Sequence, residues 1–317
     1  MIQQSWCFTI GVTAQKSIPF IDTDSESILQ MQRSNWYSLF YPPIMQADPF
    51  LFVKNDTLYL FYEYMPIGKG LGVIMVTSTK DLKHWTKPCQ ITNEPNCHFS
   101  YPFVFEDDGV VYMIPETGCE HNIRLYKAVN EELTQWEVDT ILLERTLDGS
   151  EGIEFDFADN CIYKNDQLYY LFTSILKNGE YRLELYIADH LRGPYKFHPA
   201  SPICQGNQLA RCAGSLIEAD GKLFRPAQDC LISYGSQIHL VQIDELTSTT
   251  YSEHLFKENI LPQDEKFYIH GGHHINFAKF HGKTLVATDA RYTSSFFLER
   301  VRIKIMKLLG LKENKPF

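Results

Sequence analysis

The strongest constraint on this fold is a hairpin-like stretch that recurs five times along the chain. Its first clear copy, residues 47–63, has an apolar strand, a two-residue polar turn and a second strand rich in aromatic residues. The second residues of the five turns are Asp56, Gly109, Asp166, Gly221 and Gly282. Successive spacings of 53, 57, 55 and 61 residues therefore define a five-fold internal repeat.

A repeat of about fifty residues built on a strand hairpin is typical of a β-propeller blade, because one such unit cannot bury both of its faces alone. After each of the first four hairpins, a β-rich run ends in a polar turn and an aromatic residue, which supplies a third and a fourth strand. The fifth hairpin, over residues 274–289, lacks this continuation. We therefore expect the strand at residues 6–10 to complete the last blade and close a five-bladed, all-β propeller over residues 1–292.

Two segments outside the repeat differ from it in character. The lead-in at residues 11–46 is irregular, contains three prolines and is compatible with a short helix over residues 25–33. The tail at residues 293–317 predicts a C-terminal amphipathic helix with a basic face, which either contacts an anionic membrane surface or caps the propeller. Alternation over residues 301–305 also leaves a short strand open. The apolar positions of the tail are Phe297, Leu298, Val301, Ile305, Leu308 and Leu309, and the basic ones are Arg300, Arg302, Lys304, Lys307 and Lys312.

Composition argues against several classes of function. The formal net charge of −10 argues against a nucleic-acid partner, since such proteins need a basic surface to replace counterions. The eight cysteines include no Cys-x-x-Cys pair, so a zinc ribbon is not expected. No apolar run is long enough to cross a bilayer, and residues 1–5 lack the pattern of a secretory signal. We expect a cytoplasmic protein that is peripheral at the inner membrane face where its tail binds lipid.

The inner strands of a propeller end around one channel, so equivalent positions of the five blades should meet there. The positions eight residues before each turn marker are Asp48, Tyr101, Ala158, Ala213 and His274. The positions seven residues after it are Glu63, Glu116, Thr173, Gln228 and Asp289. Because several of these side chains are ionisable and a hydrophobic core does not select such groups, we expect a functional site at the channel mouth.

Glycosidic chemistry needs two carboxyl groups across a pocket, one to activate an incoming hydroxyl and one to assist the leaving group. Asp48 paired with Glu116 or Asp156 meets this requirement, so these three are the candidate catalytic residues. Each also has a structural interpretation. Asp48 could cap a turn, Glu116 could form a rim salt bridge, and Asp156 competes with Glu154 and Asp159 for the third-blade position.

The remaining candidates are assigned to substrate binding. Arginine is the usual partner of phosphate or carboxylate, although arginines in a channel also pair with acids for structure alone. The substrate-binding candidates are Glu63, His98, Tyr101, Arg211, Arg225, Gln228, Asp229 and His274. The histidine-rich stretch at residues 270–274 is read as a turn, so no metal site and no cofactor are predicted, and a divalent metal has no support.

Several motifs resemble a known propeller family. They are Ala47-Asp48-Pro49-Phe50, His98-Phe99-Ser100-Tyr101-Pro102-Phe103, Tyr112-Met113-Ile114-Pro115-Glu116-Thr117, Arg211-Cys212-Ala213-Gly214 and Arg225-Pro226-Ala227-Gln228-Asp229-Cys230. Over roughly residues 45–275 the chain is similar to the N-terminal domain of plant glucosamine inositolphosphorylceramide transferases and to bacterial proteins of surface-polysaccharide clusters. It departs from that family at Cys212, where proline is usual, and around His274. The resemblance implies a propeller that serves glycan or glycolipid assembly.

A more distant resemblance links the Asp-Pro opening of the first blade to the five-bladed glycoside hydrolases of families 43 and 32. Those enzymes draw acids from the first, third and fourth blades, and Asp48 and Asp156 match the first two. The fourth blade offers Arg211, Cys212 and Ala213 where the acidic glutamate is expected. The hydrolase pattern is therefore incomplete.

Three functions are compatible with these features. The leading hypothesis is a glycosyltransferase-type enzyme of surface-glycan synthesis that binds a sugar nucleotide at the cytoplasmic face of a membrane. The first alternative is a glycoside hydrolase of the family 43 type that cleaves an oligosaccharide. The second alternative is a propeller that binds a glycan without catalysis.

Overall fold

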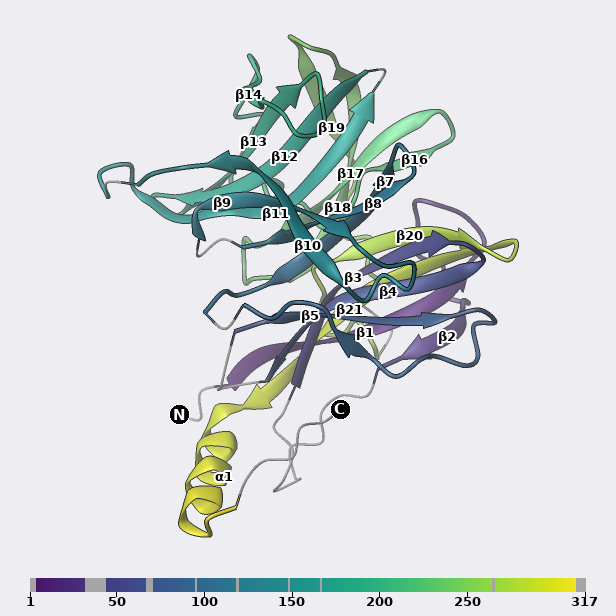
Figure 1. Ribbon diagram of the computed structural model, residues 1–317, viewed down its shortest axis with the longest axis vertical. Helices are drawn as coiled ribbons and strands as arrows, with labels where there is room; N and C mark the ends of the chain where they lie inside the picture. The colour runs from purple at the N-terminus through teal and green to yellow at the C-terminus, as the bar shows by residue number, and fades with distance from the viewer. Residues whose placement is uncertain are drawn as a thin grey trace.

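The computed structural model describes residues 4–31, 44–66, 71–94, 96–117, 120–147, 149–165, 167–263 and 266–311. Five antiparallel sheets are arranged as the blades of a propeller, and a single short helix follows the last of them (Figure 1). The predicted all-β five-bladed propeller with a C-terminal helix is thus confirmed. Asp166, the third turn marker, lies outside the described residues.

The first four blades each run outward from an inner strand in chain order. Blade one contains β3 (Ile44–Lys54), β4 (Thr57–Pro66), β5 (Val73–Thr79) and β6 (Cys89–Gln90). Blade two contains β7 (Ser100–Asp107), β8 (Val110–Glu116), β9 (Asn122–Ala128) and β10 (Trp136–Glu144). Blade three contains β11 (Ile153–Asn165), β12 (Leu168–Lys177), β13 (Glu180–Ala188), β14 (Lys196–Phe197) and β15 (Cys204–Gln205). Blade four contains β16 (Ile217–Ala219), β17 (Lys222–Asp229), β18 (Gln237–Leu246) and β19 (Tyr251–Lys257).

The fifth blade joins the two ends of the repeat in one sheet. Its strand order from the channel outward is β20 (Ile275–Phe280), β21 (Lys283–Ser295), β1 (Gln4–Gln15) and β2 (Glu26–Gln30). The strand β1 pairs with β21 over its whole length, which closes the ring. The short helix considered for residues 25–33 is wrong where the structure describes this segment, because β2 pairs as an outer strand with β1. Residues 32 and 33 lie outside the described residues.

The second strands of the first three blades are largely apolar on both faces because each packs between two neighbouring sheets. In β4, Leu58 and Leu60 face the fifth blade, where they pack with Ile10 and Leu285. Phe61, on the opposite face of β4, packs in the cluster shared with blade two. Each fully buried side chain of this size stabilises the fold by about 1.5–3 kcal/mol, so the blades hold one another in place.

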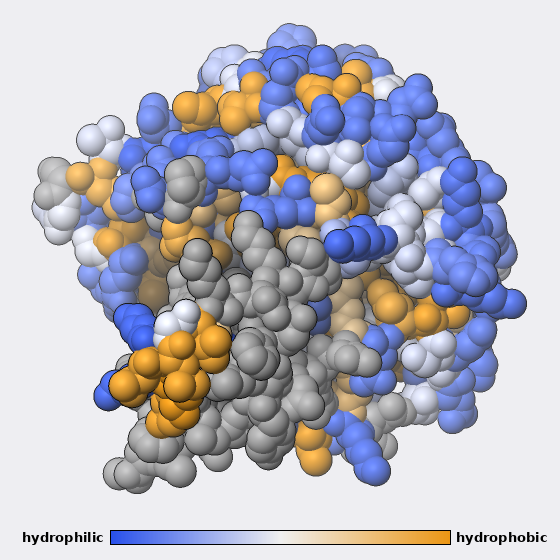
Figure 2. Space-filling model, turned by 60° about the horizontal axis from the view of Figure 1, so that its bottom comes forward, coloured by the Kyte–Doolittle hydropathy of each residue, from blue (hydrophilic) through white to orange (hydrophobic). Residues whose placement is uncertain are grey.

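The helix α1 (Phe296–Leu308) continues directly from β21 and extends away from the propeller body (Figure 1). Met306 is buried, whereas Leu308 and Leu309 are 85% and 61% exposed. Figure 2 shows an apolar patch on this side of the molecule, where α1 lies in Figure 1. Within the described chain, no helix has the length and apolar character needed to cross a membrane. Lys312 and the side chains of Phe297, Leu298 and Arg300 fall outside the description.

Candidate functional site

The inner strands of the first three blades share one backbone distortion near the channel mouth. Asp48, Tyr101 and Asp159 have φ values of 52°, 46° and 53°, in the left-handed region that residues other than glycine rarely adopt. In all three blades the strand register shifts at this point, which marks a β-bulge. Strained non-glycine residues persist only where the surrounding structure fixes them, and they concentrate at functional sites.

In the third blade, the turn marker lies one residue later than the sequence count assumed. Asn165 pairs with Leu168, so the residue that directly precedes the second strand, equivalent to the other turn markers, is Gln167. Eight residues before Gln167 stands Asp159. The structural counterpart of Asp48 in this blade is therefore Asp159 and not Ala158 or Asp156.

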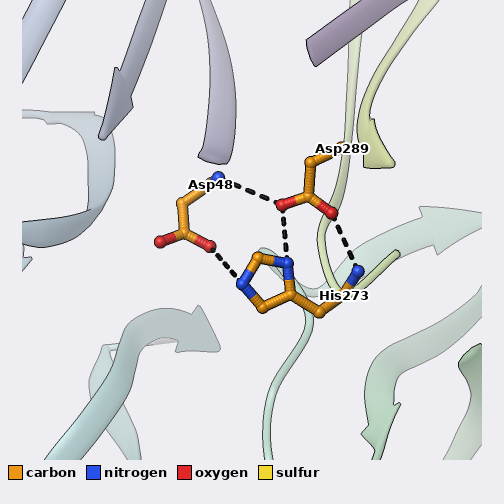
Figure 3. A group of neighbouring side chains, drawn as sticks. All are labelled: Asp48, His273 and Asp289. Atoms are coloured by element: carbon orange, nitrogen blue, oxygen red, sulfur yellow. Dashed lines mark hydrogen bonds and ion pairs between the residues drawn. The ribbon is translucent and has the colours of Figure 1, made fainter. Parts of the chain in front are cut away.

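One half of the site is built from Asp48, His273 and Asp289 (Figure 3). The His273 Nδ1 lies 2.6 Å from Asp289 Oδ2, and its Nε2 lies 3.5 Å from Asp48 Oδ1. The backbone N–H of Asp48 donates to Asp289 Oδ2 at 3.2 Å, and that of Tyr101 donates to Asp48 Oδ2 at 3.2 Å. All three side chains are buried. The first, second and fifth blades are thus joined through one network.

The other half of the site is built from the second, third and fourth blades. The backbone N–H of Asp159 donates to Glu116 Oε2 at 3.0 Å. The Asp159 Oδ2 accepts from Arg211 Nε at 2.5 Å and from Gln228 Nε2 at 3.1 Å. The Arg211 guanidinium also lies 5.0 Å from the centre of the Tyr234 ring. Among the described residues, Arg211 Nη2 donates no hydrogen bond, and the side chain is 9% exposed.

Burial raises the pKa values of three carboxyl groups at this end of the channel. Burial and the charges of Asp289 and Asp159 raise the pKa of Asp48 to about 7, although His273 opposes the shift. Burial and the neighbouring Asp159 raise the pKa of Glu116 to about 8, against the effect of Arg211. The pKa of Glu63 is raised well above its ordinary value by burial and by Asp48. At neutral pH the site therefore contains carboxyl groups able both to accept and to donate a proton.

Two predicted binding residues lie beneath the site in the channel core. Tyr101 and His274 have no exposed surface, and their rings meet edge to face with centroids 5.2 Å apart. The Tyr101 hydroxyl oxygen accepts from the backbone N–H of Gly214 at 2.8 Å. Burial lowers the pKa of His274 to about 3, so the imidazole is neutral. Their burial does not fit the expectation that they contact a sugar directly.

The structure places two more predicted residues in separate ion-pair networks. Arg225 is fully buried and donates two hydrogen bonds to Glu253, at 2.6 and 2.9 Å. Asp156 is also fully buried, and its Oδ1 accepts from Arg145 at 2.8 Å. Arg145 in turn donates to Glu184 Oε2 at 2.8 Å. These contacts tie Arg225 to packing within blade four and Asp156 to a network apart from Asp48.

Of the last two predicted residues, His98 precedes the inner strand of blade two and Asp229 ends the second strand of blade four. His98 accepts the backbone N–H of Gly72 on Nδ1 at 2.8 Å and lies 3.5 Å from Glu63 through Nε2. Asp229 lies 3.2 Å from His239 Nε2 at the end of β17. His98 and Glu63 therefore form a pair between blade one and the segment that leads into blade two, whereas Asp229 is engaged within blade four.

Asp48, His273 and Asp289 form the one trio of potential metal ligands found in the described ranges, with ligand atoms within 4.8 Å of one another. Asp289 Oδ1, however, already accepts the backbone N–H groups of His273 and His274, at 2.8 and 3.1 Å. Its Oδ2 faces Asp48 N and His273 Nδ1. A cation would have to replace the imidazole at Asp289, so the trio fits a bound proton better than a metal.

Sequence reasoning omitted three members of the site from its candidates, namely Asp159, His273 and Asp289. Asp289 stood at the forward-counted position of the fifth blade, and Asp159 would have been selected with the third turn placed one residue later. His273 lay near the start position of the fifth blade, in the histidine-rich stretch at residues 270–274 that was interpreted as a turn.

Solved structures confirm the fold. The GH43 protein BlXynB from Bacillus licheniformis superposes with a TM-score of 0.56 and 18% identity, covering 78% of this chain and 50% of that one. A family 117 glycoside hydrolase from Zobellia galactanivorans superposes with a TM-score of 0.54 and 11% identity, covering 90% of both chains. At these identities the likeness extends to the fold alone.

Sequence relatives are more specific. The rice protein named glucosamine inositolphosphorylceramide transferase 1, from Oryza sativa subsp. japonica, is 34% identical over 221 residues. The Arabidopsis thaliana protein of the same name is 33% identical over 220 residues. Each match covers 67% of this chain but only 28% and 27% of the relatives' lengths. Residues 32–288 match the family model described as glucosamine inositolphosphorylceramide transferase 1, N-terminal, and the chain therefore belongs to that family.

Proposed function

We propose that the channel mouth is the active site of a glycosyltransferase-type enzyme that uses a sugar nucleotide. The observation that carries this proposal is the convergence of Asp48, Glu116 and Arg211 from three blades at one end of the channel. Two carboxyl groups with raised pKa values suit proton transfer, and the arginine suits an anionic leaving group.

In the proposed reaction an acceptor hydroxyl attacks the anomeric carbon of the donor, and its proton passes to the Asp48 carboxylate. The bond between the anomeric carbon and the phosphate oxygen breaks, and the nucleotide leaves with the electron pair as an anion. Arg211, whose Nη2 donates to no other described residue, stabilises that anion, so no proton donor is required at the fourth blade. This use of Arg211 accounts for a positive charge where a glutamate was expected.

The acceptor and the location are also part of the proposal. Relatives that carry the name of a ceramide-linked glycolipid transferase support a lipid-linked or surface-glycan acceptor. Lys304 and Lys307 are exposed on α1 beside Leu308 and Leu309. This mixture of basic and apolar side chains suits an anionic membrane surface, and we propose that the enzyme works at its cytoplasmic face.

A second candidate function is hydrolysis of a glycosidic bond. The specific observation in its favour is the pair of pKa values, about 7 for Asp48 and about 8 for Glu116, which suits a base and an acid. In that reaction Glu116 would protonate the leaving oxygen, and Asp48 would activate water.

A thermal-shift screen against nucleotide sugars and free oligosaccharides separates the candidates. Bound ligand stabilises a protein by roughly 2.7 kcal/mol at one hundred times its dissociation constant, so modest binders are detected. We expect one nucleotide sugar to raise the melting temperature, and Arg211→Lys to abolish the increment. Arg225→Lys is the matched control, because it alters a fully buried arginine whose hydrogen bonds run to Glu253 and to Leu209 O.

The screen also defines the outcomes that contradict transfer. If no nucleotide sugar shifts the melting temperature, the transferase proposal fails. A shift with oligosaccharides alone, together with release of a free sugar that Asp48→Asn abolishes, would establish the hydrolase. A shift without turnover of the bound sugar would identify a glycan-binding propeller.

A further inference from the structure

The imidazole of His273 is enclosed between two carboxyl groups that come from different blades (Figure 3). Its Nδ1 lies 2.6 Å from Asp289, and its Nε2 lies 3.5 Å from Asp48. The side chains of His273, Asp48 and Asp289 are 3%, 7% and 0% exposed, so water has little access to these contacts. Each ring nitrogen therefore lies within ion-pair distance of a carboxylate oxygen.

Packing fixes the plane of this ring. Phe8 stacks on it with a centroid distance of 4.0 Å and an interplanar angle of 20°. Tyr234 meets it edge to face at 5.0 Å. A Cβ built on Gly235 would stand 3.0 Å from the Cβ of His273, so the loop backbone packs closely against this residue. The imidazole can thus adopt few orientations other than the one that joins the two carboxyl groups.

Asp289 is anchored as an anion. Its Oδ1 accepts backbone N–H groups from His273 and His274, and its Oδ2 accepts that of Asp48 while facing the imidazole. The three backbone donors stabilise the Asp289 carboxylate, and its charge 2.6 Å from Nδ1 favours a positively charged His273, although Nδ1 and Oδ2 do not meet in hydrogen-bond geometry. Asp48 is held less completely, since among the described residues only the Tyr101 N–H and the His273 ring face its oxygens.

We propose that His273 is a positioning residue, which Asp289 holds as an imidazolium and which orients the Asp48 carboxylate and places a positive charge beside it. The effect of His273 on the charge and orientation of Asp48 can be measured in the protein without substrate. Its role in catalysis rests on the proposed function. His273 touches no reacting atom in this scheme and acts only through Asp48.

Electrostatics agree with this arrangement. Burial alone would lower the pKa of His273, but Asp289 and Asp48 outweigh burial and raise the pKa above its ordinary value. Burial likewise opposes ionisation of Asp289, yet His273 lowers the pKa of that carboxyl group. The titratable groups that face or influence the ring are Asp48, Asp289, Asp159, His274 and Tyr234.

We call the His273 imidazolium held between Asp289 and Asp48 the clamp. Nuclear magnetic resonance tests this clamp without any substrate. In protein labelled with ¹⁵N-histidine, the resonance lost in His273→Gln identifies this ring among the 11 histidines. We expect both of its nitrogens to remain protonated at pH 7.5, above the ordinary titration of histidine near 6.5. Asp289→Asn should lower that titration midpoint more than Asp48→Asn does, because Asp289 is the nearer carboxylate. His274 is the internal control and should show no protonation between pH 5 and 9.

A second measurement tests the effect on Asp48. In protein labelled with ¹³C-aspartate, the Asp48 carboxyl should titrate at least about one pH unit higher in His273→Gln, because a neighbouring cation is lost. The matched control is His198→Gln, since His198 is also fully buried but bonds to Thr247 O and Ala200 N, away from Asp48. Where a substrate is turned over, His273→Gln should lower kcat by about 10- to 150-fold and shift the acidic limb of its pH profile upward, whereas His198→Gln should not.

The outcomes separate this inference from the proposed function. A neutral His273 at pH 6, or an Asp48 midpoint that is unchanged in His273→Gln, overturns the clamp whether or not the protein is active. If both titrations behave as expected and no substrate is turned over, the clamp stands and the catalytic proposal fails. A normal pH profile in an active His273→Gln variant would also overturn the positioning role.

Discussion

Replacing Asp48 by asparagine should reveal how much ionisation of the buried Asp48 carboxyl group opposes folding at neutral pH. Asparagine has nearly the same shape but carries no charge, and its carbonyl can still accept from the Tyr101 N–H. The pKa of Asp48 is raised from 3.8 to about 7 by burial, which is about 3 units. At 1.36 kcal/mol per unit, ionising this carboxyl in the folded protein opposes folding by about 4 kcal/mol.

The sign follows from proton binding. Between pH 4 and pH 7 the folded protein keeps the Asp48 proton, whereas the unfolded chain has already released it. The stability associated with this group is therefore fully present below pH 3.8 and is lost as the pH rises through about 7. Relative to Asp48→Asn, we expect the wild-type free energy of unfolding to fall by about 4 kcal/mol between pH 4 and pH 8.

Urea unfolding followed by fluorescence of the four tryptophans measures this difference. Groups that do not interact with Asp48 titrate equally in both proteins and cancel, and any constant effect of the asparagine does not change with pH. The control is Asp108→Asn, an exposed turn residue with φ of 48°, a conformation that asparagine also adopts. A difference between wild type and Asp48→Asn that is flat from pH 4 to pH 8 would refute the reasoning.

Other substitutions test the blade contacts and the second carboxyl group. Arg225→Met removes both arginine hydrogen bonds from Glu253, which is 10% exposed and keeps only the Tyr251 hydroxyl among its described partners, so urea unfolding should show a loss of about 3 kcal/mol, and ligand-induced thermal shifts should persist. Gly214→Ala places a Cβ 1.9 Å from Ile275 O at a φ of 142°, so the melting temperature should fall by an amount equivalent to roughly 3 kcal/mol; an unchanged value would contradict this close approach. Glu116→Gln should remove the alkaline limb near pH 8 from the kcat/KM profile of a hydrolase, and a limb that persists would identify another acid.

The fold was predictable because each hairpin carries its own turn and apolar pattern. The second strands of the first three blades are nearly continuous apolar runs, because neighbouring blades cover both faces of the strand, as Leu58 and Phe61 show in β4. The lead-in was less predictable. Residues 26–30 form a strand only because the edge of β1 is available to pair with them, and that partner lies far from them in the repeat pattern.

The site was predictable in outline but not in its members. Counting from the turns found Asp48 and Glu116, because these blades keep the same hairpin length. The count failed for Asp159, where two adjacent polar residues made the turn ambiguous by one position and a one-residue slip changes which side chain reaches the channel. Arg211 and Arg225 looked equivalent in sequence. Only the tertiary contacts separate the arginine at the mouth from the one bound to Glu253.

The bond between the Asp48 N–H and Asp289 joins residues 241 positions apart, across the seam where the ring closes. At about 5–20 residues per second, a ribosome needs roughly 12–50 s to advance from one to the other. Throughout that interval the edge of β1 that pairs with β21 is unpaired. The strained backbone at Asp48 also lacks the Asp289 carboxylate that accepts its N–H. A nascent or shortened chain that stops before β21 can therefore stack four blades while having neither a closed ring nor an assembled site. Ring closure and assembly of the site thus occur together, late in synthesis.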